Sequence, residues 1–252
     1  MSKPKIAICD FTDCEGCQVQ IISLREKLLD LEKHFDIVDW RLVQAKKEKG
    51  PYFATLVEGT PITPSEIETL KYFREQSKYI FGLGSCASLA GIPGIISKEN
   101  REKWYKIIYG AGYKPQGIDA LPIQAFVKVD FLIHGCPVGQ EQLVRFFEEL
   151  MAGQTPSYRN YSVCFECKVE GNPCRLVEKK PCLGPITQAG CKAVCVSGGS
   201  ACYGCFGLRT EPNIRALLTI LNNITDKKEI ERYFTMFLSR TEEYQKIVKP
   251  NL

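Results

Sequence analysis

Eight of the thirteen cysteines of this 252-residue chain fall within 42 residues, between Cys164 and Cys205. Glycine, proline and serine are frequent in that stretch and long apolar runs are few, so a sheet or a helix bundle could bury little of it. Thiols in a reducing compartment are seldom paired, and an odd number of them leaves one over, so metal binding is the leading explanation. The sequence therefore predicts a segment that bound metal holds together.

The rest of the composition, with 44% hydrophobic and 25% charged residues, is that of an ordinary globular chain. The first residues contain no apolar signal segment and no twin arginine, so we expect a cytoplasmic protein. Residues 79–97 carry no charge, but their glycines and Pro93 favour a buried strand and a glycine-rich loop over a membrane span. A net charge of +4, with both signs evenly mixed, argues against a nucleic-acid partner.

The first 152 residues alternate strand-like and helix-like patterns. Short apolar or alternating runs predict strands at residues 5–9, 35–40, 53–57, 79–83 and 129–133. Helical spacing or capping signals predict helices at residues 19–31, 63–76 and 139–151. Strands separated by helices indicate a parallel sheet covered on both faces, so we expect a flavodoxin-like, doubly wound α/β domain over residues 1–152.

A linker-like composition at residues 152–161 precedes the cysteine-rich part. We expect residues 153–252 to form a small irregular domain that ends in two helices, at residues 211–223 and 226–244. The second helix has Asp226 and Glu229 in the arrangement of a capping box.

Four cysteines of the α/β part directly follow predicted strands: Cys14, Cys17, Cys86 and Cys136. The carboxyl ends of parallel strands meet at one edge, where doubly wound folds bind their ligands, so these thiols should converge. Four thiolates select zinc or an iron–sulfur cluster, and neighbouring glycines favour the cluster because its bulk needs close backbone approach. The alternative is that Cys86 and Cys136 are small buried side chains, as we expect for Cys9 inside its strand.

The remaining eight cysteines are enough for two sites of four ligands. Their spacing is C-x2-C-x6-C-x7-C and then C-x3-C-x6-C-x2-C, formed by Cys164, Cys167, Cys174 and Cys182, then Cys191, Cys195, Cys202 and Cys205. This pattern differs from the compact ferredoxin run and from the usual zinc ribbon. Zinc remains an alternative on spacing alone.

These motifs resemble those of one known family. Asp13-Cys14-Glu15-Gly16-Cys17, Gly84-Ser85-Cys86, Gly135-Cys136-Pro137 and Cys202-Tyr203-Gly204-Cys205 are similar to motifs in the small, electron-transferring subunit of [NiFe] hydrogenases. Four cysteines at every site resemble the cytosolic group, which includes sulfhydrogenase, viologen-reducing, deazaflavin-reducing and electron-bifurcating complexes. Uptake enzymes of the family have His-x-x-Cys at the distal site and often proline at the medial site, where this chain has Cys164 and Cys195.

The resemblance implies three [4Fe-4S] clusters and a subunit that is not catalytic alone. The proximal cluster would use Cys14, Cys17, Cys86 and Cys136; the distal one Cys164, Cys167, Cys174 and Cys182; the medial one Cys191, Cys195, Cys202 and Cys205. The implied partners are a [NiFe] hydrogenase large subunit and flavin or iron–sulfur subunits that pass electrons to NAD(P) or ferredoxin.

Two other functions stay open at this point. A single-cluster subunit like that of a respiratory complex should have an adjacent Cys-Cys pair and no eight-cysteine tail. A zinc-stapled binding protein would use the same thiols without redox chemistry. Among other residues, Asp13 and Glu58 lie at the ligand edge of the sheet and could contact the proximal site, whereas His34 and His134 are expected to be structural.

Overall fold

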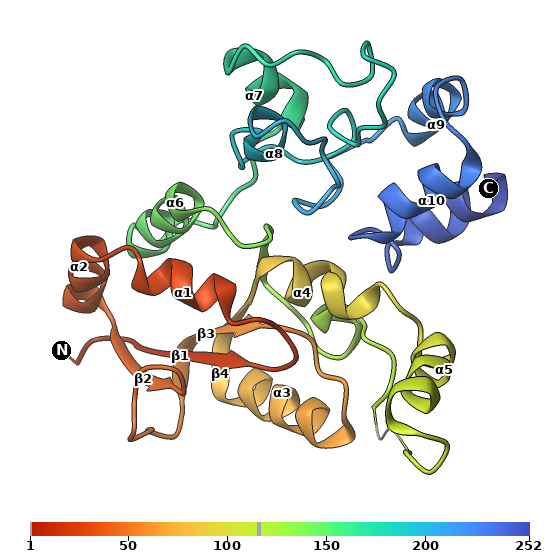
Figure 1. Cartoon of the computed structure of the whole chain (residues 1–252). Helices are drawn as coiled ribbons and strands as arrows, with labels where there is room; N and C mark the ends of the chain where they lie inside the picture. The colour runs from red at the N-terminus through yellow and green to blue at the C-terminus, as the bar shows by residue number, and fades with distance from the viewer. Residues whose placement is uncertain (1, 115–116) are drawn as a thin grey trace.

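The computed structural model describes residues 2–114 and 117–252. In these ranges five parallel strands form one sheet in the order β2-β1-β3-β4-β5 (Figure 1). Their bounds are β1 Lys5–Asp10, β2 Asp36–Trp40, β3 Tyr52–Glu58, β4 Ser77–Leu83 and β5 Phe131–Ile133. This is the flavodoxin-like strand order, so the predicted doubly wound α/β fold is confirmed.

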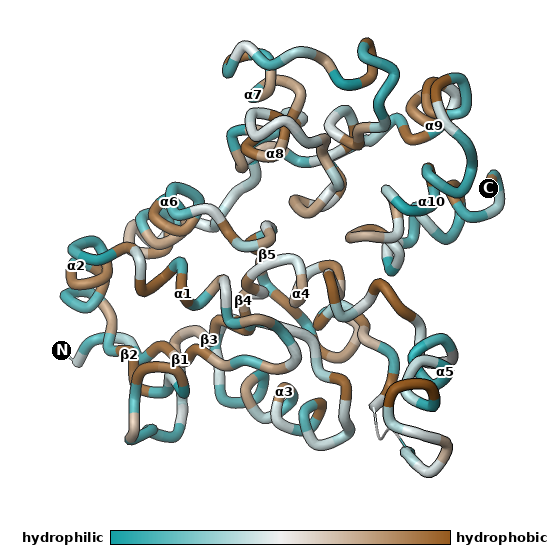
Figure 2. The backbone as a smooth tube through the Cα atoms, viewed as in Figure 1, coloured by the Kyte–Doolittle hydropathy of each residue, from teal (hydrophilic) through white to brown (hydrophobic). Residues whose placement is uncertain are grey.

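Helices cover both faces of the sheet (Figure 1). On one face, α1 (Gly16–Ile22), α2 (Glu26–His34) and α6 (Gln140–Met151) contribute buried side chains to a core shared with β1, β3 and β4. On the other face lies α3 (Pro64–Gln76), whose Leu70 and Phe73 pack with Ile80 of β4. The strands themselves are mainly hydrophobic, as Figure 2 shows for β1 and β3, which is typical of a parallel sheet buried on both sides.

Two sequence predictions in this half were wrong in detail. The helix expected at residues 19–31 is interrupted at Arg25, whose φ of 53° no right-handed helix allows, so it forms α1 and α2. The glycine-rich loop expected after β4 is instead α4 (Gly84–Leu89), followed by a 3₁₀ turn at Ile92–Gly94 and by α5 (Lys98–Tyr109). Gly84 has a φ of +84°, which lets the chain turn from strand to helix without a loop.

The cysteine-rich half contains α7 (Val163–Val169) and α8 (Val194–Ser197), and the chain continues through α9 (Ile214–Asn222) and α10 (Lys227–Thr235). Contrary to the expectation of little core, apolar side chains of α9 and α10 pack against Leu183 and Ile186 of the cysteine-rich stretch. The last predicted helix ends at Thr235 and not at residue 244. A separate helical segment, Tyr244–Val248, starts after Thr241, whose hydroxyl accepts a hydrogen bond from Tyr244 N.

None of the helices in the described ranges combines the length and hydrophobicity that a bilayer-spanning segment requires.

Helix α3 begins with a complete capping box. Thr63 Oγ1 accepts a hydrogen bond from Glu66 N at 3.3 Å, and the Glu66 carboxylate accepts one from Thr63 N at 2.9 Å. We expect Thr63→Ala to lower the free energy of unfolding by about 1 kcal/mol, because a helix amide loses its partner. Denaturant titration measures this loss. Glu75→Ala, an exposed change in the last turn of the same helix, is the control; an equal loss in both variants would contradict the role of the cap.

Candidate metal centres

The four cysteines of the α/β half lie at the carboxyl edge of the sheet. Cys14 follows β1, Cys17 is in the first turn of α1, Cys86 is in α4, and Cys136 follows β5. Burial and then the charge of Cys136 raise the pKa of Cys86 to about 12. Cys136 is exposed as a residue, but partial burial of its thiol and then the charge of Cys14 raise its pKa. The parallel sheet therefore brings together thiols that are far apart in the sequence, whereas Cys9 is buried in the core between the sheet and α3.

The backbone approaches these thiols closely at two glycines. A Cβ atom on Gly84 would lie 2.4 Å from Cys17 Sγ, and one on Gly16 would lie 3.2 Å from Cys14 Sγ. Gly135 has another role, since its Cβ would meet the Pro137 carbonyl oxygen and Val138. The cradle around the first group of thiols is thus formed by two of the three glycines that the sequence singles out.

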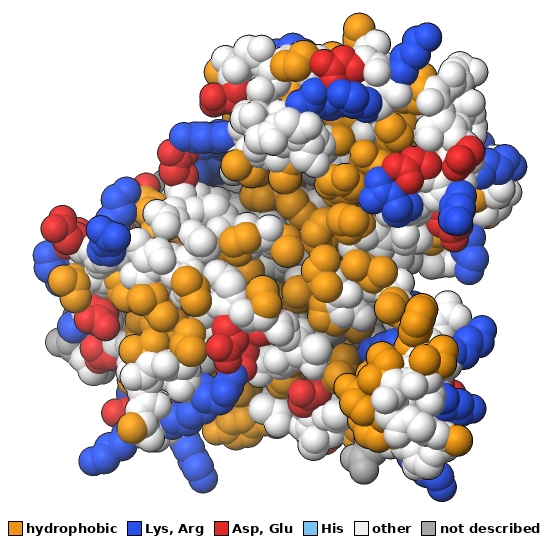
Figure 3. All heavy atoms as spheres, in the orientation of Figure 1, with side chains coloured by type: hydrophobic (Ala, Val, Ile, Leu, Met, Phe, Trp, Pro, Cys, Tyr) orange, Lys and Arg blue, Asp and Glu red, His pale blue; other side chains and the backbone are white. Residues whose placement is uncertain are grey.

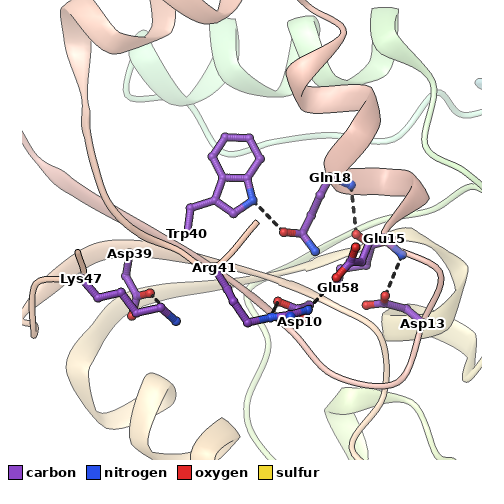
Figure 4. A network of polar contacts seen from close by, with 9 residues as sticks. All are labelled: Asp10, Asp13, Glu15, Gln18, Asp39, Trp40, Arg41, Lys47 and Glu58. Carbon is purple, nitrogen blue, oxygen red and sulfur yellow. Dashed lines mark hydrogen bonds and ion pairs between the residues drawn. The ribbon is translucent and has the colours of Figure 1, made fainter. Parts of the chain in front are cut away.

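A buried carboxylate from β3 lies at the start of α1, beside Gln18 (Figure 4). Glu58 is 2% exposed and accepts hydrogen bonds from Cys17 N and Gln18 N, both at 2.9 Å. Asp13 Oδ2 is buried and has no hydrogen-bond partner within the described ranges. Burial and then the charge of Glu58 raise the pKa of Asp13 to about 7. Two acids therefore lie beside the proximal thiols, and the Glu58 hydrogen bonds anchor the start of α1.

The first four tail cysteines gather around α7, which carries Cys164 and Cys167. A Cβ atom on Gly184 would lie 3.2 Å from Cys164 Sγ and 3.5 Å from Cys182 Sγ. A single atom at this position would therefore contact both sulfur atoms. Burial and then the charge of Cys182 raise the pKa of Cys164 to about 11, with Cys167 and Cys174 contributing in the same direction. These four thiols are neighbours in the folded chain.

The last four tail cysteines line one cavity of about 320 Å³ between the two halves of the chain, far more than the roughly 15 Å³ that a single water needs. Its lining comprises Cys191, Cys195, Cys202 and Cys205, with Cys136 of the first group and apolar side chains. The cavity lining also contains Thr187, whose hydroxyl oxygen lies 3.5 Å from Cys202 Sγ. The sequence analysis did not identify this residue.

Neighbouring thiol groups lie side by side. Cys136 of the first group lines the same cavity as Cys205, and burial and then the charge of Cys191 raise the pKa of Cys205. On the other side, Cys202 N donates to Cys182 Sγ at 3.4 Å. Ser85 adds a third link, because its hydroxyl donates to the Cys205 carbonyl. The group that lines the cavity thus lies between the other two.

The donor set suits an iron–sulfur group. No three His, Cys, Asp or Glu side chains in the described ranges converge closely enough to hold one metal ion. The structure has twelve thiols in three groups. Glycine backbone lies against the group that contains Cys17 and against the group that contains Cys164, and the group that contains Cys205 lines a cavity. Soft thiolates suit both iron–sulfur clusters and zinc, and the close backbone approach fits the bulkier group. His134 Nδ1 lies 2.8 Å from Ser88 Oγ.

Comparison with known proteins agrees with this geometry. A family model described as NADH ubiquinone oxidoreductase, 20 Kd subunit, matches residues 14–150. Sulfhydrogenase 2 subunit delta of Pyrococcus furiosus is 35% identical over 235 residues, which cover 92% of this chain and 98% of that protein. The chain belongs to the small-subunit family of [NiFe] hydrogenases. A subunit of the vhu F420-non-reducing hydrogenase of Methanocaldococcus jannaschii is also similar to this small subunit, at 30% identity over 81% of each chain.

The fold of this hydrogenase small subunit also occurs in solved structures. The actinobacterial-type NiFe-hydrogenase from Ralstonia eutropha H16 matches 92% of this chain and 88% of that chain, with a TM-score of 0.55 and 14% identity. At that identity the match shows a shared fold alone. The family makes this chain a subunit of an oxidoreductase that is not catalytic by itself.

Proposed function

We propose that this small subunit relays electrons through three [4Fe-4S] clusters. The α/β half, residues 1–152, holds the proximal cluster on Cys14, Cys17, Cys86 and Cys136. The second half, residues 153–252, holds the medial cluster on Cys191, Cys195, Cys202 and Cys205 and the distal cluster on Cys164, Cys167, Cys174 and Cys182. Bound clusters supply one-electron chemistry, and the protein supplies spacing, burial and hydrogen bonds.

The linked order of the thiol groups is the observation that carries this proposal. Cys136 of the first group lines the same cavity as Cys205, and Cys202 N donates a hydrogen bond to Cys182 Sγ of the third group. A protein that only needed zinc for stability would gain nothing from ligand groups joined in a series. A relay needs such a series, because electrons must pass from one cluster to the next.

The large subunit is proposed to dock on an apolar face beside the proximal cluster. Cys14, Cys136 and Cys195 are exposed there. Exposed large apolar side chains lie on α1, on α8 and in the turn after α4: Val19, Ile22, Val194, Ile92 and Ile95. Figure 3 shows hydrophobic side chains gathered between the two halves on this face. Permanent interfaces are apolar, which favours an obligate partner at this position.

Electrons leave the distal cluster for other subunits. Relatives are named as sulfhydrogenase, F420-non-reducing and NAD-reducing hydrogenases. We therefore place this subunit in a cytoplasmic complex whose flavin or iron–sulfur subunits exchange electrons with NAD(P) or ferredoxin. The H₂ chemistry belongs to the NiFe site of the large subunit.

Metal analysis of the anaerobically purified complex tests the cluster assignment. Each site with four cysteines should hold four iron and four sulfide, so we expect about 12 of each for this chain once the iron of co-purifying subunits is subtracted. Cys9→Ala should keep that number, since Cys9 lies in the core, whereas Cys182→Ala should lower it. About 4 iron with bound zinc would assign the tail to zinc, and about 4 iron without zinc would favour a single-cluster subunit.

A further inference from the structure

Glu166 connects the distal and medial thiol groups. It lies in α7 between Cys164 and Cys167, and it is 6% exposed. Its Oε2 atom accepts hydrogen bonds from Gly190 N at 3.1 Å and from Lys192 N at 3.0 Å. These two residues flank Cys191, so a carboxylate from the distal helix holds the loop that presents a medial ligand.

This arrangement acts on the medial site in two ways. The carboxylate brings a negative charge close to Cys191, and that charge is one of the causes, after burial, that raise the pKa of this thiol. It also occupies two backbone amides that flank the ligand. Backbone amides that donate hydrogen bonds to cluster sulfurs stabilise the reduced cluster. Amides that already donate to a carboxylate cannot donate to these sulfurs.

Within the described ranges, Arg159 is the cation that pairs with the buried carboxylate. Arg159 Nη1 lies 3.5 Å from Glu166 Oε1, and the arginine side chain is 38% exposed. The nearby Lys192 side chain is directed elsewhere, since its ammonium pairs with Glu141. The electrostatic field at Cys191 therefore depends on the buried Glu166 carboxylate and on the partly solvated Arg159 guanidinium, which have opposite charges.

The proximal thiols have the same arrangement. There the Glu58 carboxylate accepts hydrogen bonds from Cys17 N and Gln18 N, that is, from a ligand and its neighbour. Two of the three thiol groups thus have a buried carboxylate that holds backbone amides next to a ligand cysteine. The repetition at unrelated sequence positions indicates a shared requirement of the two sites.

We infer that Glu166 is a positioning residue that lowers the reduction potential of the medial cluster, and that Arg159 partly offsets it. The inference rests on the proposed function. A medial cluster held by these cysteines would exchange single electrons with its neighbours, and the fixed negative charge of Glu166 would disfavour its reduced state. Burial strengthens this effect because little water screens the charge.

A redox titration of the intact hydrogenase complex, followed by electron paramagnetic resonance, tests this inference. In Glu166→Gln the side-chain shape and an oxygen acceptor remain while the charge is lost, so the midpoint potential of the medial signal should rise. We expect the ratio of reduced to oxidised cluster at a fixed poise to increase about tenfold, or 59 mV for one electron. Arg159→Gln should shift the potential in the opposite direction. Glu170→Gln, an exposed change at the end of the same helix, should leave it unchanged, because water and salt screen its charge.

Opposite shifts of the medial potential in Glu166→Gln and Arg159→Gln distinguish an electrostatic role of Glu166 from a structural one. Unchanged potentials in both variants, or shifts in the same direction at full iron content, would overturn the inference. If Glu166→Gln loses medial iron, Arg159→Gln decides alone, since it leaves the hydrogen bonds of the carboxylate in place. A wild-type complex in which this chain lacks the expected 12 iron would refute the proposed function instead.

Discussion

Replacing Gly84 by alanine should remove the proximal cluster from this hydrogenase small subunit. The added Cβ would lie 2.4 Å from Cys17 Sγ, at a backbone φ of +84°, so either the thiol or the start of α4 must move. We expect the iron content of the chain to fall by about 4, because four iron occupy each site with four cysteines. H₂-dependent dye reduction should be almost completely lost. Iron analysis and electron paramagnetic resonance, in which the medial and distal signals persist, measure this outcome.

Gly110→Ala is the matched control for this prediction. Gly110 has nearly the same φ, +85°, but its added Cβ would meet nothing within 4 Å. Both positions have a positive φ that disfavours alanine, and only Gly84→Ala crowds a thiol. Equal iron loss in both would assign the effect to strain, and full iron in Gly84→Ala would show that Cys17 is not a ligand in this position.

Replacing Cys195 by proline should convert the medial cluster to a three-iron form. Cys195 is the second residue of α8, where proline removes no hydrogen bond of the helix. Three thiolates would remain, the number that the resemblance to the uptake enzymes implies for a three-iron core. The loss of one iron and one ligand should raise the potential, so H₂ production from a low-potential donor should fall more than H₂ oxidation with a high-potential dye.

Electron paramagnetic resonance of the oxidised complex detects the three-iron core directly. Cys195→Ala is the companion variant, since it removes the thiolate without the proline ring and should give the same signal. If no new signal appears and both directions of catalysis fall equally, Cys195 is not a medial ligand. Cys191, Cys202 and Cys205 would then have to be grouped with another thiol.

Local patterns were sufficient for most of the α/β half. The strands are recognisable because a sheet covered on both faces needs short apolar runs, and the start of α3 because Thr63 and Glu66 form a capping box. The interruption at Arg25 was missed, since apolar residues keep their helical spacing across it. The positive φ of Arg25, a residue that is not glycine, has no local signal in the sequence.

Some features of the candidate site could also be predicted from the sequence, and others could not. The convergence of Cys14, Cys17, Cys86 and Cys136 could be predicted, because parallel strands bring their carboxyl ends to one edge. The role of Glu166 could not be predicted, because a glutamate between two cysteines has the same sequence signature whether it faces water or is buried. Its hydrogen bonds reach amides 24 and 26 residues away.

By itself, the sequence determined the fold class, the kind of donor atom and the grouping of cysteines along the chain. These follow from periodicity and from side-chain chemistry, which are local properties. Only the tertiary structure decided the order of the three thiol groups in space. The contacts that establish this order, such as that from Ser85 to the Cys205 carbonyl across 120 residues, arise when the two halves pack together. Packing depends on the shapes of complete surfaces, which no single segment of the sequence contains.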